Sequence, residues 1–483
     1  MNSSVLETPA SAATALCVDL DGSLVRSDTL IDSLLVMARR KPVRLLRLPL
    51  VVLRGKAAFK AWVTDAVALD VSCLPYNRPL LNYLQQQHDA GRAIYLATGA
   101  DERLAQRIAA HLGIFSGVLG SDGAVNLTAH NKLDRLRGFL KSQDFAYVGN
   151  ATADLPLLAA SSEPMVANPT AGLRLRLKTR GIHPAQSFVE PAQPLRALLK
   201  ATRLHQWAKN LLIFLPLLLA HKAGDFPLLL RTLIAFLSFS LTASATYIVN
   251  DLLDIEADRR HPRKRLRPFA AGTLPVSAGL AISGLFLALA LAGTQFLPAS
   301  FSLWLLLYLA ATLSYSLYLK RMPLVDVLLL SGLYTMRLIT GSAATGIVIS
   351  HWLAGFSIFL FLSLAFVKRF AELENLRASD TPPRNGRGYM IADLEQLRAF
   401  GTSCAFASAI VLANYISSRD VTVLYNQSGR LWLMVPLLIL WLCRVWLLAS
   451  RGELNEDPVV FAITDKMSLL LGVATVLVVW LAH

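Results

Sequence analysis

The chain has 483 residues, enough for about two to four domains at roughly 100–200 residues each. It is 54% hydrophobic and only 16% charged, which is too apolar for an ordinary soluble or disordered protein, so membrane spans are expected. In so hydrophobic a chain the net charge of +15 fits basic membrane loops, and no nucleic-acid partner is predicted. The four cysteines form no CxxC pair, so neither a disulfide framework nor a zinc site is indicated.

The first part of the chain, up to about residue 200, alternates short apolar runs with charged helical stretches, as soluble α/β domains do. Its start lacks the charged and apolar regions of a signal peptide, so this part is expected to stay in the cytoplasm. We predict a soluble domain at 1–182, a proline-rich linker at 183–196 and a membrane domain at 197–483.

Polar residues follow the predicted strands of the soluble domain. Asp19 and Asp21 come after an apolar strand and before a glycine turn, which places both carboxylates at the carboxyl end of a parallel sheet. Two such carboxylates can share Mg²⁺, one attacking a phosphorus atom and the other passing the proton. Thr98 ends a second strand and offers a hydroxyl to a phosphoryl oxygen. Lys132 lies on a predicted helix, and Asp154 follows a further strand.

In this order the elements resemble the haloacid dehalogenase (HAD) superfamily over residues 13–185. The resemblance implies a nucleophile, a general acid/base and two phosphate ligands, in the order Asp19, Asp21, Thr98 and Lys132. Asp154 would join the first two acids around Mg²⁺. Asn150 departs from the pattern, because the family usually has an acid there and an amide binds Mg²⁺ more weakly. A domain kept only for folding or docking is therefore the alternative to a phosphatase.

Residues 30–85 would form the helical cap of this domain. Between 39 and 60 the cap has many lysines and arginines, interleaved with Leu, Val and Pro, and no acid. Such a segment could lie on an anionic membrane surface. Two packed helices with solvated basic faces are the alternative.

The membrane half contains nine apolar segments of about 20 residues, the length that crosses a bilayer, although the first is short. They are predicted at 209–222, 226–248, 274–297, 300–319, 323–345, 350–367, 397–417, 430–449 and 466–482. The expected fold is thus an α/β HAD-like domain with a helical cap, followed by an all-α polytopic bundle of nine transmembrane helices. The loop at 259–267 has six lysines and arginines, whereas the outer loops offer only Lys222, Arg419 and Arg430. The positive-inside rule then predicts that the N-terminal domain and the active sites face the cytoplasm and that the C-terminus lies outside. The expected location is the inner membrane of a bacterium.

Three acids, Asp251, Asp254 and Asp258, follow Asn250 at the end of the second predicted span. On one helix they would lie within about 60° of a single face, with Glu256 pointing away. Such carboxylates repel one another unless cations bridge them, so the spacing predicts a Mg²⁺-diphosphate site. A structural helix end is the alternative. The next residues supply positive charge for phosphate oxygens: Arg263, Lys264, Arg265 and Arg267.

This segment resembles the first aspartate motif, NDxxDxxxD, of the UbiA superfamily of intramembrane prenyltransferases, over about residues 197–483. The run HPRKRLRP that follows it looks like the branch that transfers phosphoribosyl groups to polyprenyl phosphates. Two further motifs agree: RLHQWAKN, with Arg203, Lys209 and Asn210, and KRFAEL, with Lys368, Arg369 and Glu372. The first motif departs from the branch at Leu204, where a proline is usual.

The fifth predicted span carries charges near and within it, at Lys320, Asp326 and Arg337. Asp326 and Arg337 are about three helical turns apart, so they are predicted to share a face. Ionisable groups inside a span usually line a cavity, which favours a substrate-binding role. A structural pair between Asp326 and an arginine of another helix is the alternative.

The resemblance implies Mg²⁺-dependent transfer of 5-phosphoribosyl from phosphoribosyl diphosphate to a polyprenyl phosphate, with release of diphosphate. The HAD-like domain could then remove the 5-phosphate. Membrane lipid is the surrounding partner, and a homo-oligomer is compatible with the sequence. An aromatic-acid polyprenyltransferase that uses a polyprenyl diphosphate is the first alternative, and a membrane-anchored HAD phosphatase is the second.

Overall fold

The computed structural model describes residues 14–141, 144–190, 193–377, 387–454 and 458–483. The chain forms two compact units. The first comprises Met1–Ala201 and Ile248–Ala281, and the second comprises Thr202–Tyr247 and Ile282–His483. The aspartate-rich segment therefore belongs to the same compact unit as the N-terminal domain. The predicted domain boundaries stay a prediction, and residues 191–192 of the predicted linker lie outside the described residues.

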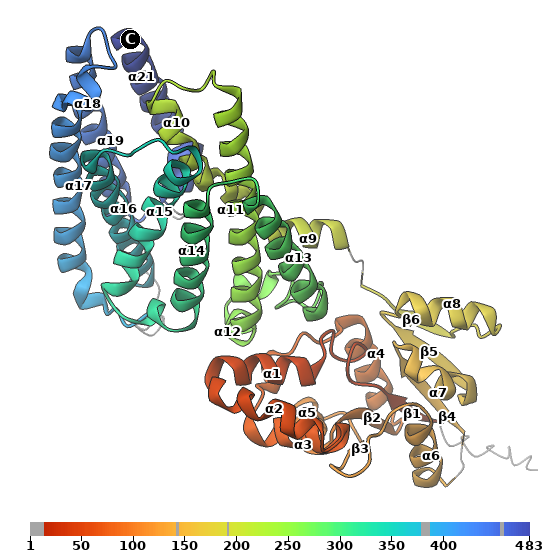
Figure 1. Ribbon diagram of the computed structural model, residues 1–483. Helices are drawn as coiled ribbons and strands as arrows, with labels where there is room; N and C mark the ends of the chain where they lie inside the picture. The colour runs from red at the N-terminus through yellow and green to blue at the C-terminus, as the bar shows by residue number, and fades with distance from the viewer. Residues whose placement is uncertain (1–13, 142–143, 191–192, 378–386, 455–457) are drawn as a thin grey trace, which may run out of the picture. The chain divides into compact units, whose positions relative to one another are not determined.

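The first unit is built on a six-stranded sheet in the order β3-β2-β1-β4-β5-β6 (Figure 1). All neighbouring strands are parallel. The strands are β1 Ala15–Val18, β2 Ile94–Asp101, β3 Gly117–Ser121, β4 Phe145–Gly149, β5 Glu163–Ala167 and β6 Gln186–Phe188. Because the crossovers leave β1 in opposite directions, ligands are expected beside its carboxyl end. This confirms the predicted α/β architecture.

Both faces of the sheet are covered, as its continuous apolar strands require. Leu16 and Val18 pack into the core on one face, and Cys17 packs into the core on the other. The helices of this part are α1 Thr29–Arg40, α2 Leu48–Val52, α3 Lys56–Ala66, α4 Arg78–Asp89, α5 Glu102–Leu112, α6 Ala129–Phe139, α7 Leu155–Ala160, α8 Ala171–Thr179 and α9 Pro194–Thr202. The first four lie between β1 and β2 in the chain, where the cap is predicted.

The second unit is helical. Two of its long helices, α11 and α13, also extend into the first unit. The long helices are α11 Phe226–Leu253, α13 Val276–Thr294, α14 Ala299–Leu317, α15 Val325–Thr345, α16 His351–Arg377, α17 Leu394–Ser417, α19 Met434–Ser450 and α21 Lys466–Ala482. In the described part of the chain, seven helices are long and apolar enough to cross a membrane. An eighth span is formed if α20, Pro458–Thr464, and α21 count as one, although they are bent by 77° at the break between them.

A bundle of nine transmembrane helices is not confirmed. The segment predicted as the first span, 209–222, instead contains the end of a 3-10 helix, Leu204–Phe214, and the short α10, Leu215–Leu219. Pro216 lies at the start of α10, and a proline cannot donate the backbone hydrogen bond that would continue a helix through it. Hydropathy alone could not reveal this break, because residues 211–220 are apolar on both sides of Pro216.

Candidate functional site

The predicted acid stack is interrupted by a break in the helix. The span α11 ends at Leu253, and α12, Ile255–Arg260, begins two residues later. Asp254 lies at the break with φ −93° and ψ 8°, outside the α-helical region. The three aspartates therefore do not share one continuous helix, contrary to the assumption behind their predicted alignment.

Arg267 brings two of the aspartates together. Its Nη1 atom lies 3.1 Å from Asp251 Oδ1 and 2.7 Å from Asp258 Oδ2. Both aspartates are only 3% exposed. Burial and the nearby charge of Asp251 raise the pKa of Asp258, while Arg267 acts against this shift. Two buried carboxylates that converge on one positive nitrogen are a donor set that suits a hard cation.

The third aspartate has a different neighbour. Arg39 of α1 lies 3.2 Å from Asp254. Glu256 pairs with Arg40 and with Arg260, each at 2.7 Å. Among the described ion pairs it does not share Arg267 with the aspartates, as expected for a side chain that points away from them. In the described part of the chain, no group of three or more His, Cys, Asp or Glu is placed to hold a metal ion. The structure thus brings together Asp251 and Asp258, with Asp254 directed toward α1.

The remaining residues of this motif have plainer positions. Asn250 is half-buried in the last turn of α11. Arg263, Lys264 and Arg265 are exposed, in or next to the short 3-10 helix Lys264–Leu266. Only Arg267, of the four predicted basic residues, contacts the aspartates through a described ion pair.

A second polar cluster lies beyond the end of β1. Lys132 of α6 donates to Asp19 at 2.7 Å and lies 3.4 Å from Asp154. Tyr147 of β4 donates to Asp154 at 2.8 Å. These side chains come from four different parts of the first unit and are almost fully buried. Three of them were expected together, whereas Tyr147 gave no signal because a tyrosine in a strand is usually part of the core.

Asp21 and Thr98 complete this second cluster. Asp21 Oδ1 accepts the backbone N–H of Thr29 at 2.8 Å, where α1 begins. Burial raises the pKa of Asp19 to about 6 and that of Asp21 to about 7. Thr98 is fully buried, and its hydroxyl accepts the N–H of Ala100.

The cap helix α3 adds a residue that the sequence did not single out. Lys60 donates to the carbonyl of Gly99 at 2.5 Å and to Asn126 at 2.8 Å. Burial lowers its pKa. Within a run of many basic residues, nothing distinguishes this lysine until the fold places it beside Thr98. Asn150 lies against Gly22, the residue after Asp21. A side chain added at Gly22 would collide with the Asn150 amide.

In the second unit, Asp326 forms a fully buried ion pair with Arg369 of α16 at 2.5 Å. Tyr389 donates to the other oxygen of Asp326, and Arg369 also binds Glu372 at 2.7 Å. Asp326 is thus paired with an arginine of another helix, which is the arrangement considered as the alternative to a cavity-lining role. Arg337, predicted to share its face, hydrogen-bonds elsewhere.

Arg337 lies among aromatic rings. Its Nε donates to Asn210 at 2.8 Å, and its guanidinium lies over the rings of Phe239, Tyr308 and Tyr334. Lys209 lies over the Tyr334 ring as well, 5.6 Å from its centroid. Two buried cations beside one ring make this part of the bundle suitable for an anion.

The other predicted residues of the second unit are placed separately. Arg203 lies over the ring of Tyr247, 5.3 Å from its centroid. Lys320 belongs to the short 3-10 helix Leu319–Arg321, and Lys368 is half-buried in α16. The structure gives these three residues no common described cluster.

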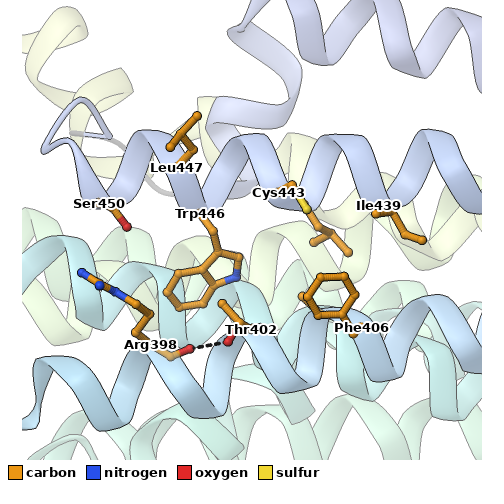
Figure 2. Close-up of a pocket in the computed structure, with 10 residues that line it drawn as sticks. Arg398, Thr402, Phe406, Ile439, Cys443, Trp446, Leu447 and Ser450 are labelled. Carbon is orange, nitrogen blue, oxygen red and sulfur yellow. Dashed lines mark hydrogen bonds between the residues drawn. The ribbon is translucent and has the colours of Figure 1, made fainter.

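An apolar pocket of about 240 Å³ lies between α17 and α19 (Figure 2). Phe406, Ile439 and Trp446 contribute to its lining, and Arg398 lies at the end away from Ile439 (Figure 2). The described residues that line it include none of those predicted for a site. Its lining is apolar except for Arg398, Thr402 and Ser450.

Comparison with known proteins places these clusters in context. The family model described as the UbiA prenyltransferase family matches residues 210–471. A decaprenyl-phosphate phosphoribosyltransferase of Mycobacterium tuberculosis is 33% identical over 59% of this chain and 93% of its own length. An uncharacterized protein of Sinorhizobium fredii is 37% identical over 95% of this chain and 89% of its own length. Its similarity therefore extends over both halves of the chain.

The N-terminal part is similar to a solved structure. A HAD family hydrolase from Salmonella enterica serovar Typhi aligns with 35% of this chain and 66% of its own, at 14% identity and a TM-score of 0.27.

Proposed function

Because the chain belongs to the UbiA prenyltransferase family, we propose that it is an integral membrane transferase that moves 5-phosphoribosyl from phosphoribosyl diphosphate to a polyprenyl phosphate. The bond between ribose C1 and the diphosphate oxygen breaks, and a bond forms from C1 to an oxygen of the lipid phosphate. Diphosphate leaves with the bonding electron pair. The observation that carries the proposal is the convergence of Asp251 and Asp258 on Arg267.

Asp251 and Asp258 would hold a Mg²⁺ ion, with Asp254 close to them in sequence. Bound Mg²⁺ would neutralise the charge that accumulates on the leaving diphosphate. Arg267 supports this role, since its guanidinium can turn from the carboxylates to a phosphate oxygen when a metal takes over their charge. The break at Asp254 lets residues on both sides of it face one ligand.

Arg337 and Lys209 support the binding of an anionic substrate. Both are buried, and Arg337 hydrogen-bonds to two neutral oxygens, so a phosphate would bring a negative charge to this guanidinium. Because the acceptor phosphate is already an anion, the reaction needs little general-base catalysis. The surrounding helices are apolar enough to pack against an isoprenoid chain.

The test uses the full-length protein in detergent with Mg²⁺, labelled phosphoribosyl diphosphate and a polyprenyl phosphate. The lipid extract is then analysed by mass. A lipid that gains phosphoribose supports the proposal. The variants Asp251→Asn and Asp258→Asn should lose this activity. Their matched control is Glu256→Gln, because Glu256 lies on the same helix as Asp258 but pairs with Arg40 and Arg260 instead of Arg267.

The alternative reaction has a distinct outcome. If no label enters the lipid but a polyprenyl group moves from its diphosphate to an aromatic acid, the protein is an aromatic-acid prenyltransferase. Neither transfer, with phosphate release intact, would leave a membrane-anchored phosphatase.

We also propose that the N-terminal domain removes the 5-phosphate from the lipid product. Asp19 would attack phosphorus, and the bond from phosphorus to the ribose 5-oxygen would break as Asp21 gives that oxygen a proton. Water would then release inorganic phosphate from Asp19, with Asp21 taking up the proton of the water. Lys132, Thr98 and the cap residue Lys60 would bind phosphate oxygens. The buried contact of 2.7 Å between Lys132 and Asp19 supports this assignment. Asp19 and Asp21 would hold Mg²⁺, which would offset the charge of the phosphate. Asp154, the third acid expected there, binds Lys132 and Tyr147 in the structure.

This second step is tested on the same lipid extract. Complete turnover would give a lipid that carries ribose and an equal amount of inorganic phosphate. An Asp19→Asn variant should stop at phosphoribose, whereas Asp122→Asn, an exposed acid of the same domain, should not. Wild-type protein that makes phosphoribosylated lipid and releases no phosphate would refute the second step and leave the first intact.

A further inference from the structure

Residues 42–56 present large apolar side chains to solvent. The segment contains a 3-10 helix, Pro42–Arg47, and α2, Leu48–Val52, directly after α1. The exposed fractions are 75% for Val43, 79% for Leu46, 66% for Leu50 and 84% for Leu53. Single exposed apolar residues are ordinary, but a run of them marks an interaction surface.

The same segment is strongly basic. No acid occurs between residues 39 and 60. Four cationic residues lie among the apolar ones and are all exposed: Arg44, Arg47, Arg54 and Lys56. A partner that matches both properties is apolar inside and anionic at its surface, which describes a bilayer with anionic lipid head groups.

Ion pairs tie the start of this segment to the end of a membrane span. Arg39 lies 3.2 Å from Asp254, and Arg40 lies 2.7 Å from Glu256. Both acids come within three residues of Leu253, where the span α11 ends. The segment that follows Arg40 therefore begins beside the end of α11.

The inner face of the segment is fixed by the fold. Val51 is only 7% exposed, and Leu45 packs against the core of the domain. Lys41 donates to the carbonyl of Ala66 at 2.9 Å. Since these contacts set the orientation, the outward leucines are a feature of the folded cap. Solvated basic helices, the alternative for this region, would not need leucines on the outer face.

We propose that residues 42–56 lie on the anionic lipid surface at the membrane face where α11 ends. Val43, Leu46, Leu50 and Leu53 enter the boundary between head groups and acyl chains, and the basic residues pair with lipid phosphates. The contact fixes the cap against the membrane. It is independent of the reaction that the protein catalyses, because no residue assigned to catalysis takes part.

The test places an environment-sensitive fluorophore on Leu50→Cys in the full-length protein. The background carries Cys73→Ser, Cys404→Ser and Cys443→Ser, while the fully buried Cys17 is kept. The protein is reconstituted in nanodiscs of phosphatidylcholine, with or without phosphatidylglycerol, and with nitroxide-labelled lipid as quencher. Leu46→Cys is a second probe position, used in parallel in case labelling at 50 disturbs the fold.

The matched control is Leu175→Cys on α8, a leucine that is 65% exposed between two arginines but outside the segment. In nanodiscs that contain phosphatidylglycerol, the fluorescence emission of the probe at 50 or 46 should shift to shorter wavelength and be quenched by the nitroxide lipid. The emission of the probe at 175 should show neither change. Arg44→Gln and Arg47→Gln should each weaken the lipid contact about fivefold. The proposal would be overturned if the probes at 46 and 50 were not quenched, or if the probe at 175 were quenched equally. Quenching that does not depend on phosphatidylglycerol would overturn it as well.

Discussion

Arg259 of α12 donates to Asp32 of α1 at 2.7 Å, and both side chains are nearly inaccessible to solvent. Ser27 donates to the same oxygen of Asp32. Arg259 directly follows Asp258, while α1 begins at Thr29, whose N–H binds Asp21. The contact between α12 and α1 therefore connects the two proposed sites, because α12 contains Asp258 and the start of α1 binds Asp21.

Removing the acid of this pair should destabilise the protein severely. Asp32→Ala would leave the buried Arg259 without its counter-charge, which typically costs about 3–5 kcal/mol. Thermal unfolding of the purified protein measures the loss. Asp70→Ala is the control, because its partner Arg260 is half exposed and such pairs contribute about 0–1 kcal/mol. Equal effects of the two variants would contradict a special role for the buried pair.

The two buried aspartates should be essential for transfer. Asp251→Asn and Asp258→Asn each remove a charge that the proposed Mg²⁺ site needs, so the transfer rate should fall about 100-fold or more. Initial rates at several Mg²⁺ concentrations, and with EDTA, provide the measurement. Glu256→Gln should keep most of the activity. Undiminished Mg²⁺-dependent transfer by the Asp251 variant would remove that residue from the site.

Lys132 should matter for the hydrolytic step alone. Lys132→Met removes the cation that holds Asp19 and Asp154 together, so phosphate release should fall steeply while phosphoribosyl transfer continues. Tyr147→Phe tests the same cluster more gently, since it deletes only the hydroxyl that binds Asp154. Both products are counted in one lipid and phosphate assay. Loss of transfer in parallel would indicate a folding defect instead.

The raised pKa values of Asp19 and Asp21 predict a pH dependence of stability in metal-free protein. Their folded pKa values, about 6 and about 7, exceed the value of about 4 for an unfolded aspartate. The folded state then binds protons more tightly, so the stability they add at low pH is lost as pH rises through 6 and 7. In EDTA, the apparent Tm should fall between pH 5 and pH 8. Asp21→Asn should flatten the fall, and a Tm that rises over this range would contradict the assignment.

The sequence predicted those features that depend on local pattern. Alternating apolar runs indicated the parallel sheet, and acids after a strand indicated where Asp19 and Asp21 would lie, because parallel strands share one carboxyl edge. Tertiary partners were beyond reach. Nothing local shows that Arg267 returns to Asp251, or that Asp326 meets Arg369 from another helix, because such pairs depend on how the chain folds back.

Helix continuity was also beyond the sequence. The acids at i, i+3 and i+7 fit one face of an ideal helix, yet the backbone leaves the helix at Asp254. At the break Asp254 pairs with Arg39 of α1, a contact that the local sequence does not reveal. The apolar run before Pro216 was misread for the related reason that hydropathy reports composition and not backbone geometry.

The strand order of the first unit determines when its sheet can form during synthesis of the chain. β1 leaves the ribosome first but needs both β2 and β4 as neighbours, so the sheet stays open until late in the synthesis of the domain. β6 ends at Phe188, and the first long span begins at Phe226, about 40 residues or roughly 2–8 s later. The sheet can thus close before membrane insertion starts. The pair between Asp32 and Arg259 can form only after α11 has been made, so the finished soluble domain offers a preformed surface on which the aspartate segment settles.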